Sequence, residues 1–256
     1  MQIIRYQDGG VARLGIVEDG QVRAAGGELF GPLLPRDQIG ALGDFTLLPP
    51  VAPGKIVAVG LNYVDHAAQP GERTTPPAPI LFMKPPSSLI GQGDAIVIPH
   101  GADPVQHEAE LAVVIGRRAR HVRRAEARDY ILGCTCANDV SARNFQHDDG
   151  QWVRAKGFDT FCPLGPLLVT DLDVGALAIE ARVNGALRQS SSTSHLIFDV
   201  PFLIEFISGV MTLLPGDVIL TGTPAGAGPI VPGDVVAVTI AGIGTLTNTV
   251  IAEDHS

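Results

Sequence analysis

Acidic side chains occur where two apolar segments, predicted to be strands, meet polar sequence. Glu108 and Glu110 precede the apolar residues 111–115, and in a strand they would share one face. Two neighbouring carboxylates repel each other, so burying them requires a proton or a cation. Spacing alone also fits a solvent-facing strand edge. Asp139 favours a metal site, because it follows a second apolar segment, residues 131–137, and adds a third carboxylate where that strand leaves the core.

Three carboxylates without a soft ligand favour Mg²⁺ or Mn²⁺, with Ca²⁺ as a substitute, over Zn²⁺ or Cu²⁺. A metal held in this way keeps positions for water or a chelating substrate, but its charge is neutralised. Cations are then needed to attract an acid, and Arg143 and Lys156 are suitable. The alternative for both is a solvated surface charge. This alternative interpretation is less favoured for Lys156, because its sequence neighbours include Trp152 and Phe158. Desolvation by such neighbours would lower the pKa of this lysine and suit it to proton transfer.

The elements that must position these side chains are mostly strands. The chain contains 30 glycines and 20 prolines, spread along its length, and little helical periodicity, which predicts an α+β fold rich in β-structure. Residues 1–50 are predicted to form a small N-terminal β subdomain, and residues 51–256 a larger unit that opens with a buried strand at residues 55–59.

Helices and turns are expected at a few marked positions. One helix is expected near residues 124–130, and another from Asp199 through Ile207, stopped by Gly209. The sequence Pro-Gly-Asp-Val occurs twice, at residues 215–218 and again at residues 232–235. Proline followed by glycine suits the centre of a type II turn, so we expect two such turns in a closing β-meander.

Composition excludes several classes of partner. The 256 residues carry 27 acidic and 18 basic side chains, a formal net charge of −9, and a face that binds nucleic acid must be basic. The longest apolar stretch, residues 202–214, contains Glu205 and falls short of the ~20 residues of a membrane span. No signal sequence is recognisable after Met1. We therefore expect a cytoplasmic protein without nucleic-acid or membrane contacts, whose three cysteines are reduced and buried.

Six motifs occur in an order that characterises one enzyme superfamily. Along the chain they are Gly60-Leu61-Asn62-Tyr63 with His66, Phe82-Met83-Lys84-Pro85, His107-Glu108-Ala109-Glu110-Leu111, Asn138-Asp139-Val140-Ser141-Ala142-Arg143 with Gln146, Trp152 through Lys156 to Phe158-Asp159-Thr160, and Leu220-Thr221-Gly222-Thr223-Pro224. Over about residues 51–250 the sequence resembles the fumarylacetoacetate hydrolase superfamily. This superfamily includes acylpyruvate hydrolases, oxaloacetate decarboxylases, and isomerase/decarboxylases of the homoprotocatechuate pathway.

The resemblance implies a mixed β-roll with a small N-terminal piece and, commonly, a homodimer. It implies a metal site at Glu108, Glu110 and Asp139, with Lys156 beside the metal, and it matches His66 to the catalytic histidine. The substrate-binding residues that it implies are Arg143, Gln146, Asn62, Tyr63 and Thr223.

The implied activity is that of a Mg²⁺- or Mn²⁺-dependent enzyme that acts on a 2-oxo or β-diketo acid through a metal-bound enolate. Hydrolysis of a C–C bond in an acylpyruvate-like substrate ranks first, because most of the motif set is present. Hydrolytic relatives place a glutamate three residues after the catalytic histidine, whereas this chain has Gln69, which weakens a general base. Glu72 is an alternative partner. An isomerase or decarboxylase of the homoprotocatechuate-pathway or oxaloacetate type therefore ranks second, and a catalytically silent protein that binds metal or acid ranks third.

The segment of residues 64–79 is predicted to be a mobile lid over the site. Its Pro, Gly and Thr residues offer no regular hydrogen-bonding pattern, and loops of this kind commonly close over a substrate.

Overall fold

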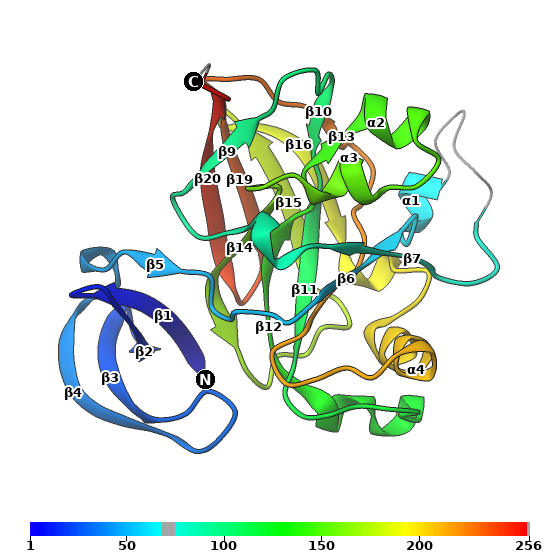
Figure 1. Ribbon diagram of the computed structural model, residues 1–256. Helices are drawn as coiled ribbons and strands as arrows, with labels where there is room; N and C mark the ends of the chain where they lie inside the picture. The colour runs from blue at the N-terminus through cyan, green and yellow to red at the C-terminus, as the bar shows by residue number, and fades with distance from the viewer. Residues whose placement is uncertain (68–74, 255–256) are drawn as a thin grey trace.

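Strands dominate the chain, which confirms the mostly β fold predicted from its turns and alternation. The computed structural model describes residues 1–67 and 75–254. In this part of the chain the strands form three sheets, and short helices lie at one side of them (Figure 1).

The largest sheet has 12 strands in the order β4-β3-β2-β1-β14-β12-β11-β17-β6-β7, with β5 beside β1 and β8 beside β14. Its strands are β1 (Gln2–Asp8), β2 (Val11–Glu18), β3 (Gln21–Gly27), β4 (Leu33–Ala41), β5 (Leu47–Leu48), β6 (Ile56–Gly60), β7 (Ile80–Lys84), β8 (Leu89–Ile90), β11 (Ala109–Ile115), β12 (Ile131–Asn138), β14 (Cys162–Val169) and β17 (Val218–Leu220).

Two smaller sheets complete the β-structure. A three-stranded sheet has the order β13-β10-β18, and a five-stranded sheet the order β16-β15-β19-β20-β9. Their strands are β9 (Ala95–Ile98), β10 (Val105–His107), β13 (Ser141–Ala142), β15 (Ala178–Val183), β16 (Ala186–Ser192), β18 (Gly228–Pro229), β19 (Val235–Ile240) and β20 (Gly244–Ala252). The helices are α1 (Val64–Ala67), α2 (Arg143–Asp148), α3 (Val153–Gly157) and α4 (Val200–Val210), with 3-10 turns η1 (Leu42–Asp44), η2 (Pro86–Ser88), η3 (Arg124–Tyr130) and η4 (Thr193–His195).

Strand β11 lies at the centre of the fold, and all seven of its residues are buried. Leu111 and Val113 belong to a core shared with Val238 of the five-stranded sheet, whereas Ala112 and Val114 belong to a second core on the opposite face. A strand covered on both faces reads as a continuous apolar run, as this one does. The side chains at its start are therefore attached to one of the most constrained parts of the molecule.

The N-terminal strands continue the largest sheet. Strands β1 to β4 form an antiparallel meander, which Figure 1 shows as a curved layer at the lower left, and β1 pairs with β14 through Gln2 and Val169. The division of the chain at residue 50 stays a prediction.

Helix α4 begins as its sequence predicts. The Asp199 side chain accepts a hydrogen bond from the backbone N–H of Phe202 at 2.9 Å, and Pro201 lies in the first turn. The helix ends at Val210, one residue beyond Gly209, which was expected to stop it. The helix expected at residues 124–130 is a 3-10 helix.

Both Pro-Gly turns form as expected, with Gly216 at φ +88° and Gly233 at φ +96°. The prediction that both turns belong to a closing β-meander is wrong for the first of them. That turn leads into β17, which joins the largest sheet parallel to β6, whereas the second leads into the β19–β20 hairpin of the five-stranded sheet. Strand β17 is short and buried along its whole length, so it fits a central position rather than a half-exposed hairpin.

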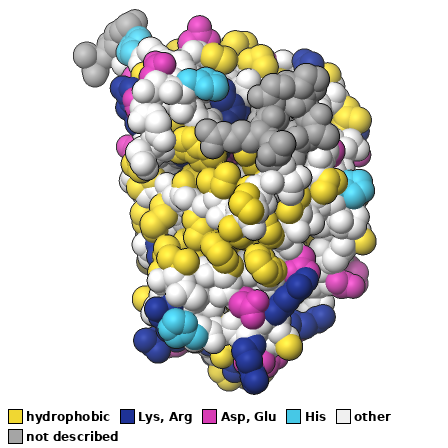
Figure 2. All heavy atoms as spheres, turned by 90° about the vertical axis from the view of Figure 1, so that its right-hand side faces the viewer, with side chains coloured by type: hydrophobic (Ala, Val, Ile, Leu, Met, Phe, Trp, Pro, Cys, Tyr) yellow, Lys and Arg dark blue, Asp and Glu magenta, His cyan; other side chains and the backbone are white. Residues whose placement is uncertain are grey.

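The three cysteines, Cys134, Cys136 and Cys162, are free and buried, and burial raises the pKa of each thiol to about 12. No helix among residues 1–67 and 75–254 has the length and apolarity to cross a membrane. Figure 2 views the right-hand side of Figure 1, where α4 lies, and shows hydrophobic side chains gathered across the middle of that face.

Candidate metal centre

Strand pairing brings the three predicted metal ligands together. Antiparallel strands β11 and β12 pair Ala109 with Asn138, so the residues flanking these two positions meet at one end of the ladder. Glu108 joins β10 to β11, Glu110 lies in β11, and Asp139 follows β12. The backbone N–H of Asp139 donates to the carbonyl oxygen of Glu108 at 2.8 Å, which ties the two ligand-bearing segments to each other.

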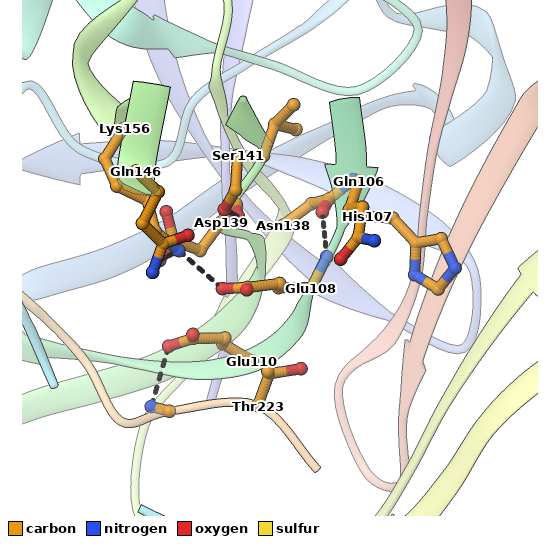
Figure 3. A network of polar contacts seen from close by, with 12 residues as sticks. Gln106, His107, Glu108, Glu110, Asn138, Asp139, Ser141, Gln146, Lys156 and Thr223 are labelled. Carbon is orange, nitrogen blue, oxygen red and sulfur yellow. Dashed lines mark hydrogen bonds and ion pairs between the residues drawn. The ribbon is translucent and has the colours of Figure 1, made fainter. Parts of the chain in front are cut away.

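The carboxylates form a tight, buried cluster. One oxygen from each of Glu108, Glu110 and Asp139 lies within 4.8 Å of the others, and the residues are 5%, 2% and 0% exposed. Figure 3 shows Glu108 and Glu110 pointing to the same side, as expected for residues two apart, whereas His107 points away from them. A buried set of three hard oxygen donors fits a divalent cation that prefers oxygen.

Three buried or half-buried cations offset the charge of the carboxylates. Lys156 Nζ donates to Glu108 Oε2 and to Asp139 Oδ2, at 2.6 Å in each case. Lys84 Nζ donates to Asp139 Oδ1 at 2.5 Å, and Arg143 forms an ion pair with Glu108. Once all three carboxylates are ionised, their charge equals that of the three cations, so a divalent ion bound to the cluster would leave an excess of positive charge for an anionic substrate to neutralise.

Glu110 holds its proton more readily than an ordinary glutamate. Burial raises its pKa well above the usual value, and the negative charges of Asp139 and Glu108 raise it further. Lys156 and the backbone N–H of Gly222 lower this pKa but do not reverse the direction. Such a group gives up its proton to a cation that takes the proton's place.

The surroundings of Lys156 correct one expectation. Burial lowers its pKa, as the apolar neighbours predicted, but the charges of Asp139 and Glu108 outweigh burial and the net direction is upward. The side chain is therefore an ammonium ion in this arrangement, and its role is that of an acid and a positive charge. Apolar sequence neighbours indicated the burial but not the two carboxylates that meet the amine.

Comparison with known proteins identifies the family. The family model described as "Fumarylacetoacetate (FAA) hydrolase C-terminal" matches residues 55–251, and a model described as "Rv2993c-like, N-terminal" matches residues 1–50. The chain belongs to the fumarylacetoacetate hydrolase family. Named relatives in this family are enzymes, and they include an isomerase, a tautomerase and a hydrolase.

Three of these relatives cover most of the chain. A crystal structure of 2-hydroxyhepta-2,4-diene-1,7-dioate isomerase from Mycobacterium marinum matches with a TM-score of 0.92 and 45% identity over 100% of both chains. The mitochondrial oxaloacetate tautomerase Fahd2a of Rattus norvegicus is 43% identical over 232 residues, which are 86% of this chain and 72% of the relative. Maleylpyruvate hydrolase from Sphingobium sp. SYK-6, in complex with manganese(II) ion and pyruvate, matches with a TM-score of 0.83 and 32% identity over 99% of this chain and 100% of that one.

The turn at residues 221–224 closes one side of the carboxylate cluster in this family member. The backbone N–H of Gly222 donates to Glu110 Oε2 at 2.7 Å (Figure 3). Gly222 has φ +100°, and a Cβ there would lie 2.8 Å from the Cβ of Asn62, so a larger residue does not fit. Thr223 Oγ1 donates to the carbonyl of Ala109 at 2.8 Å, which fixes the turn on β11.

Three further predicted substrate-binding residues already have hydrogen-bond partners within the protein. Arg143 donates to Gln146 Oε1 at 2.6 Å, so these two side chains lie together beside Glu108. The Asn62 amide donates to the carbonyls of Thr221 and Phe198 and accepts from the N–H of Phe198, which ties together the loops that carry these residues. Contact of these residues with a substrate stays a prediction.

Tyr63 combines full burial with an unpaired hydroxyl. The residue is 0% exposed, and its Oη has no hydrogen-bond partner among residues 1–67 and 75–254. Burial raises the pKa of this hydroxyl, and the charges of Glu110 and Asp65 add to the effect. The hydroxyl is therefore a neutral donor, and its predicted contact with substrate stays a prediction.

Part of the predicted site lies outside the described residues. His66 belongs to helix α1, but its side chain is not among the described parts, and Gln69 and Glu72 fall in residues 68–74. Their roles, and the lid expected at residues 64–79, stay predictions.

Two further residues near the carboxylate cluster were not predicted from the sequence as part of the site. Lys84 belongs to a family motif and ends the apolar strand β7, which marks it as unusual, although the strand pattern gives no hint of Asp139 as its partner. Gln189 carries no such signal. It accepts from the N–H of Ala109, contacts His107 Nδ1 and donates to Thr223, so it joins strand β11 to the 221–224 turn.

A cavity of about 650 Å³ lies outside this cluster. Leu196, Phe198 and Phe202 are among its apolar lining residues, with Arg124 and Arg128 beside them, and it includes none of the predicted site residues. A cavity of this volume could hold a small ligand, but the charged chemistry is concentrated at the carboxylates.

Binding of Mg²⁺ or Mn²⁺ is expected to release protons and to tighten as pH rises. The raised pKa of Glu110 means that the folded protein keeps this proton above the ordinary pKa of 4.5, and the metal requires the carboxylate. Calorimetric titration in buffers of different ionisation enthalpy measures the release. Glu126→Gln, at an exposed carboxyl whose pKa is lowered by its hydrogen bond with Arg123, should behave as wild type. Affinity that is independent of pH, without proton release, would contradict the protonation of Glu110.

Proposed function

We propose that this protein is a Mg²⁺- or Mn²⁺-dependent enzyme that converts a 2-oxo acid to its enolate, with tautomerisation or double-bond isomerisation as the outcome. The observation that carries the proposal is the position of Lys156, a buried ammonium ion 2.6 Å from two of the three candidate metal ligands. An enolate gains negative charge on the former keto oxygen, and a fixed positive charge beside that oxygen stabilises it.

Glu108, Glu110 and Asp139 would hold the divalent ion, which would supply Lewis acidity toward the keto oxygen of the substrate. Lys156 would add a second positive charge on the same side and would donate a proton to the enolate oxygen. Burial of the cluster strengthens both effects, because electrostatic interactions are stronger where water is excluded. The proton that leaves the carbon next to the keto group needs a base, and we propose His66 of the family motif for this role.

Arg143 and Gln146 are proposed to bind the substrate carboxylate. Both lie next to Glu108, and both are only partly buried, so they can be reached from solvent. In the described structure Arg143 is engaged by Glu108, Gln106 and Gln146. A guanidinium group with five N–H donors can add a carboxylate to these contacts without losing all of them.

Two sets of relatives support different outcomes. The isomerase and tautomerase relatives are 43–45% identical to this chain, and neither reaction requires an attacking water. Hydrolysis of an acylpyruvate-like C–C bond is the second candidate, supported by the match to maleylpyruvate hydrolase and by His66 in the family motif. A homodimer is also part of the proposal, and the hydrophobic side chains gathered on the face in Figure 2 support it.

Turnover of a panel of 2-oxo acids tests the proposal. Oxaloacetate and an acylpyruvate are offered with Mg²⁺, with Mn²⁺ and with a chelator, and the change in enol absorbance is followed separately from C–C cleavage products. We expect metal-dependent loss of enol absorbance to exceed cleavage. Faster cleavage favours the hydrolase, and a protein that binds metal but turns over none of the panel is a silent homologue.

Gln69→Glu is expected to raise hydrolysis of an acylpyruvate by at least about tenfold, a change of ~1.4 kcal/mol in the barrier. A carboxylate at this position restores the partner that hydrolytic relatives provide for the histidine, and a histidine paired in this way is a better base for water. Tautomerisation should change less. Gln7→Glu, at an exposed position of β1, adds the same charge elsewhere as a control. If wild type already hydrolyses fast and the variant gains nothing, another group, such as Glu72, is the base.

A further inference from the structure

Each carboxylate of the cluster has one oxygen engaged by a donor from the protein. Lys84 Nζ donates to Asp139 Oδ1 at 2.5 Å, and the N–H of Gly222 donates to Glu110 Oε2 at 2.7 Å. Arg143 donates to Glu108 Oε1. The three donors come from separate segments of the chain, and each of them contacts a different carboxylate.

The remaining oxygens face the interior of the cluster. Glu108 Oε2 and Asp139 Oδ2 both accept from Lys156 Nζ. The ammonium group of Lys156 thus occupies a position between these two oxygens that suits a positive charge. For Glu110, no hydrogen bond to Oε1 is found among residues 1–67 and 75–254. Each ligand therefore has one oxygen engaged by a separate donor, whereas the second oxygens of Glu108 and Asp139 share the amine of Lys156, which a metal ion would have to displace.

Lys84 is a fully buried donor that is held at two points. Its side chain is 0% exposed, and Nζ also donates to the carbonyl of Val140 at 3.2 Å. Its backbone pairs with Ile56 in the ladder between β6 and β7, so the base of the side chain is fixed by the sheet. The amine of Lys84 is thus positioned against Asp139 Oδ1 by contacts other than those of Lys156.

A carboxylate oxygen that already accepts from an ammonium group is a weaker ligand, so the carboxylate coordinates a metal mainly through its other oxygen. Mg²⁺ requires near-octahedral geometry and takes few carboxylates, whereas Ca²⁺ accommodates six to eight oxygens and readily takes both oxygens of one carboxylate. We propose that Lys84 sets the metal preference of this centre, by restricting Asp139 to one coordinating oxygen and so favouring Mg²⁺ over Ca²⁺. This inference rests on the proposed function only in requiring that the centre bind a divalent ion.

Lys84→Met tests the inference, because methionine keeps much of the length and loses the donor and the charge. The dissociation constants of Mg²⁺ and Ca²⁺ are measured by competition against Mn²⁺, whose free fraction is read by electron paramagnetic resonance. Loss of a positive charge strengthens binding of both ions alike, so the ratio of the two constants isolates geometry. Outer contacts to metal ligands commonly change affinity 10–100-fold, and we expect the ratio to move toward Ca²⁺ by at least about tenfold.

Lys55→Met is the matched control. Lys55 is also paired with a buried aspartate, Asp217, but this pair lies outside the carboxylate cluster. The control should keep the wild-type ratio of the two constants.

A crystal structure of the wild-type protein with Mn²⁺ decides the matter if the variant does not fold. One oxygen of Asp139 on the metal, with Lys84 still on the other, supports the inference. Asp139 bound through both oxygens overturns it, as does a wild-type ratio in a folded Lys84→Met variant. Failure of the wild-type protein to bind any divalent ion would instead remove the proposed function, and the inference with it.

Discussion

Lys156→Met is expected to lower turnover of a 2-oxo acid by on the order of 10²–10³-fold, the effect of removing one preorganised electrostatic contact from a transition state. The amine of Lys156 is a buried ammonium ion, since the charges of Asp139 and Glu108 outweigh burial and raise its pKa. Methionine removes this charge and the donated proton but leaves the three carboxylates in place. The expected loss is in kcat, because the charge acts on the developing enolate more than on the bound acid.

The same variant should still bind its metal, and at least as tightly as wild type. Lys156 Nζ bonds to one oxygen of Glu108 and one of Asp139, so in the described arrangement an incoming ion competes with the amine for these oxygens. Mn²⁺ titration of the variant measures this, with Lys55→Met as a control for loss of a lysine–aspartate pair elsewhere. A variant that keeps its turnover would show that the charge of Lys156 is not needed for catalysis. A variant that loses metal affinity would show that Lys156 serves to hold the ligands instead.

The three carboxylates that could hold a metal were recognisable because they depend on local features of the sequence. Two glutamates two residues apart share a face of an extended segment, and Asp139 follows an apolar segment with the pattern of a strand. The structure adds the strand register, in which Ala109 pairs with Asn138. Register depends on long-range pairing, which no short motif reports.

Contacts between distant segments could not be predicted in the same way. The lysine of β7 was visible as a charge at the end of an apolar strand, but its partner Asp139 is 55 residues away. The pKa of Lys156 shows the same limitation. Apolar sequence neighbours indicate desolvation, whereas the direction of the shift is set by two carboxylates from other strands. The place of β17 in the large sheet was missed for a related reason. Its parallel partner β6 is not joined to it by a short turn that the sequence could indicate.

Asp139→Asn is expected to destabilise the metal-free protein strongly. Asp139 is 0% exposed and accepts from both Lys84 and Lys156, so its loss leaves two buried ammonium ions without this partner. Removing one member of a buried ion pair costs about 3–5 kcal/mol in the free energy of unfolding. Urea denaturation in the presence of a chelator measures this loss.

Glu110→Gln, although it alters a ligand of the same cluster, should leave the metal-free protein as stable as wild type or more so. Burial, and then the charges of Asp139 and Glu108, raise the pKa of Glu110, so its favourable contribution is present at low pH and is lost as pH rises through the raised pKa. Glutamine has the shape of the protonated acid and can still accept the N–H of Gly222. Both variants should lose the metal-induced gain, about 2.7 kcal/mol for wild type at a metal concentration of 100 times Kd. Equal destabilisation by the two substitutions would contradict the charge distribution described here, because it would make Glu110 as dependent on cationic partners as Asp139.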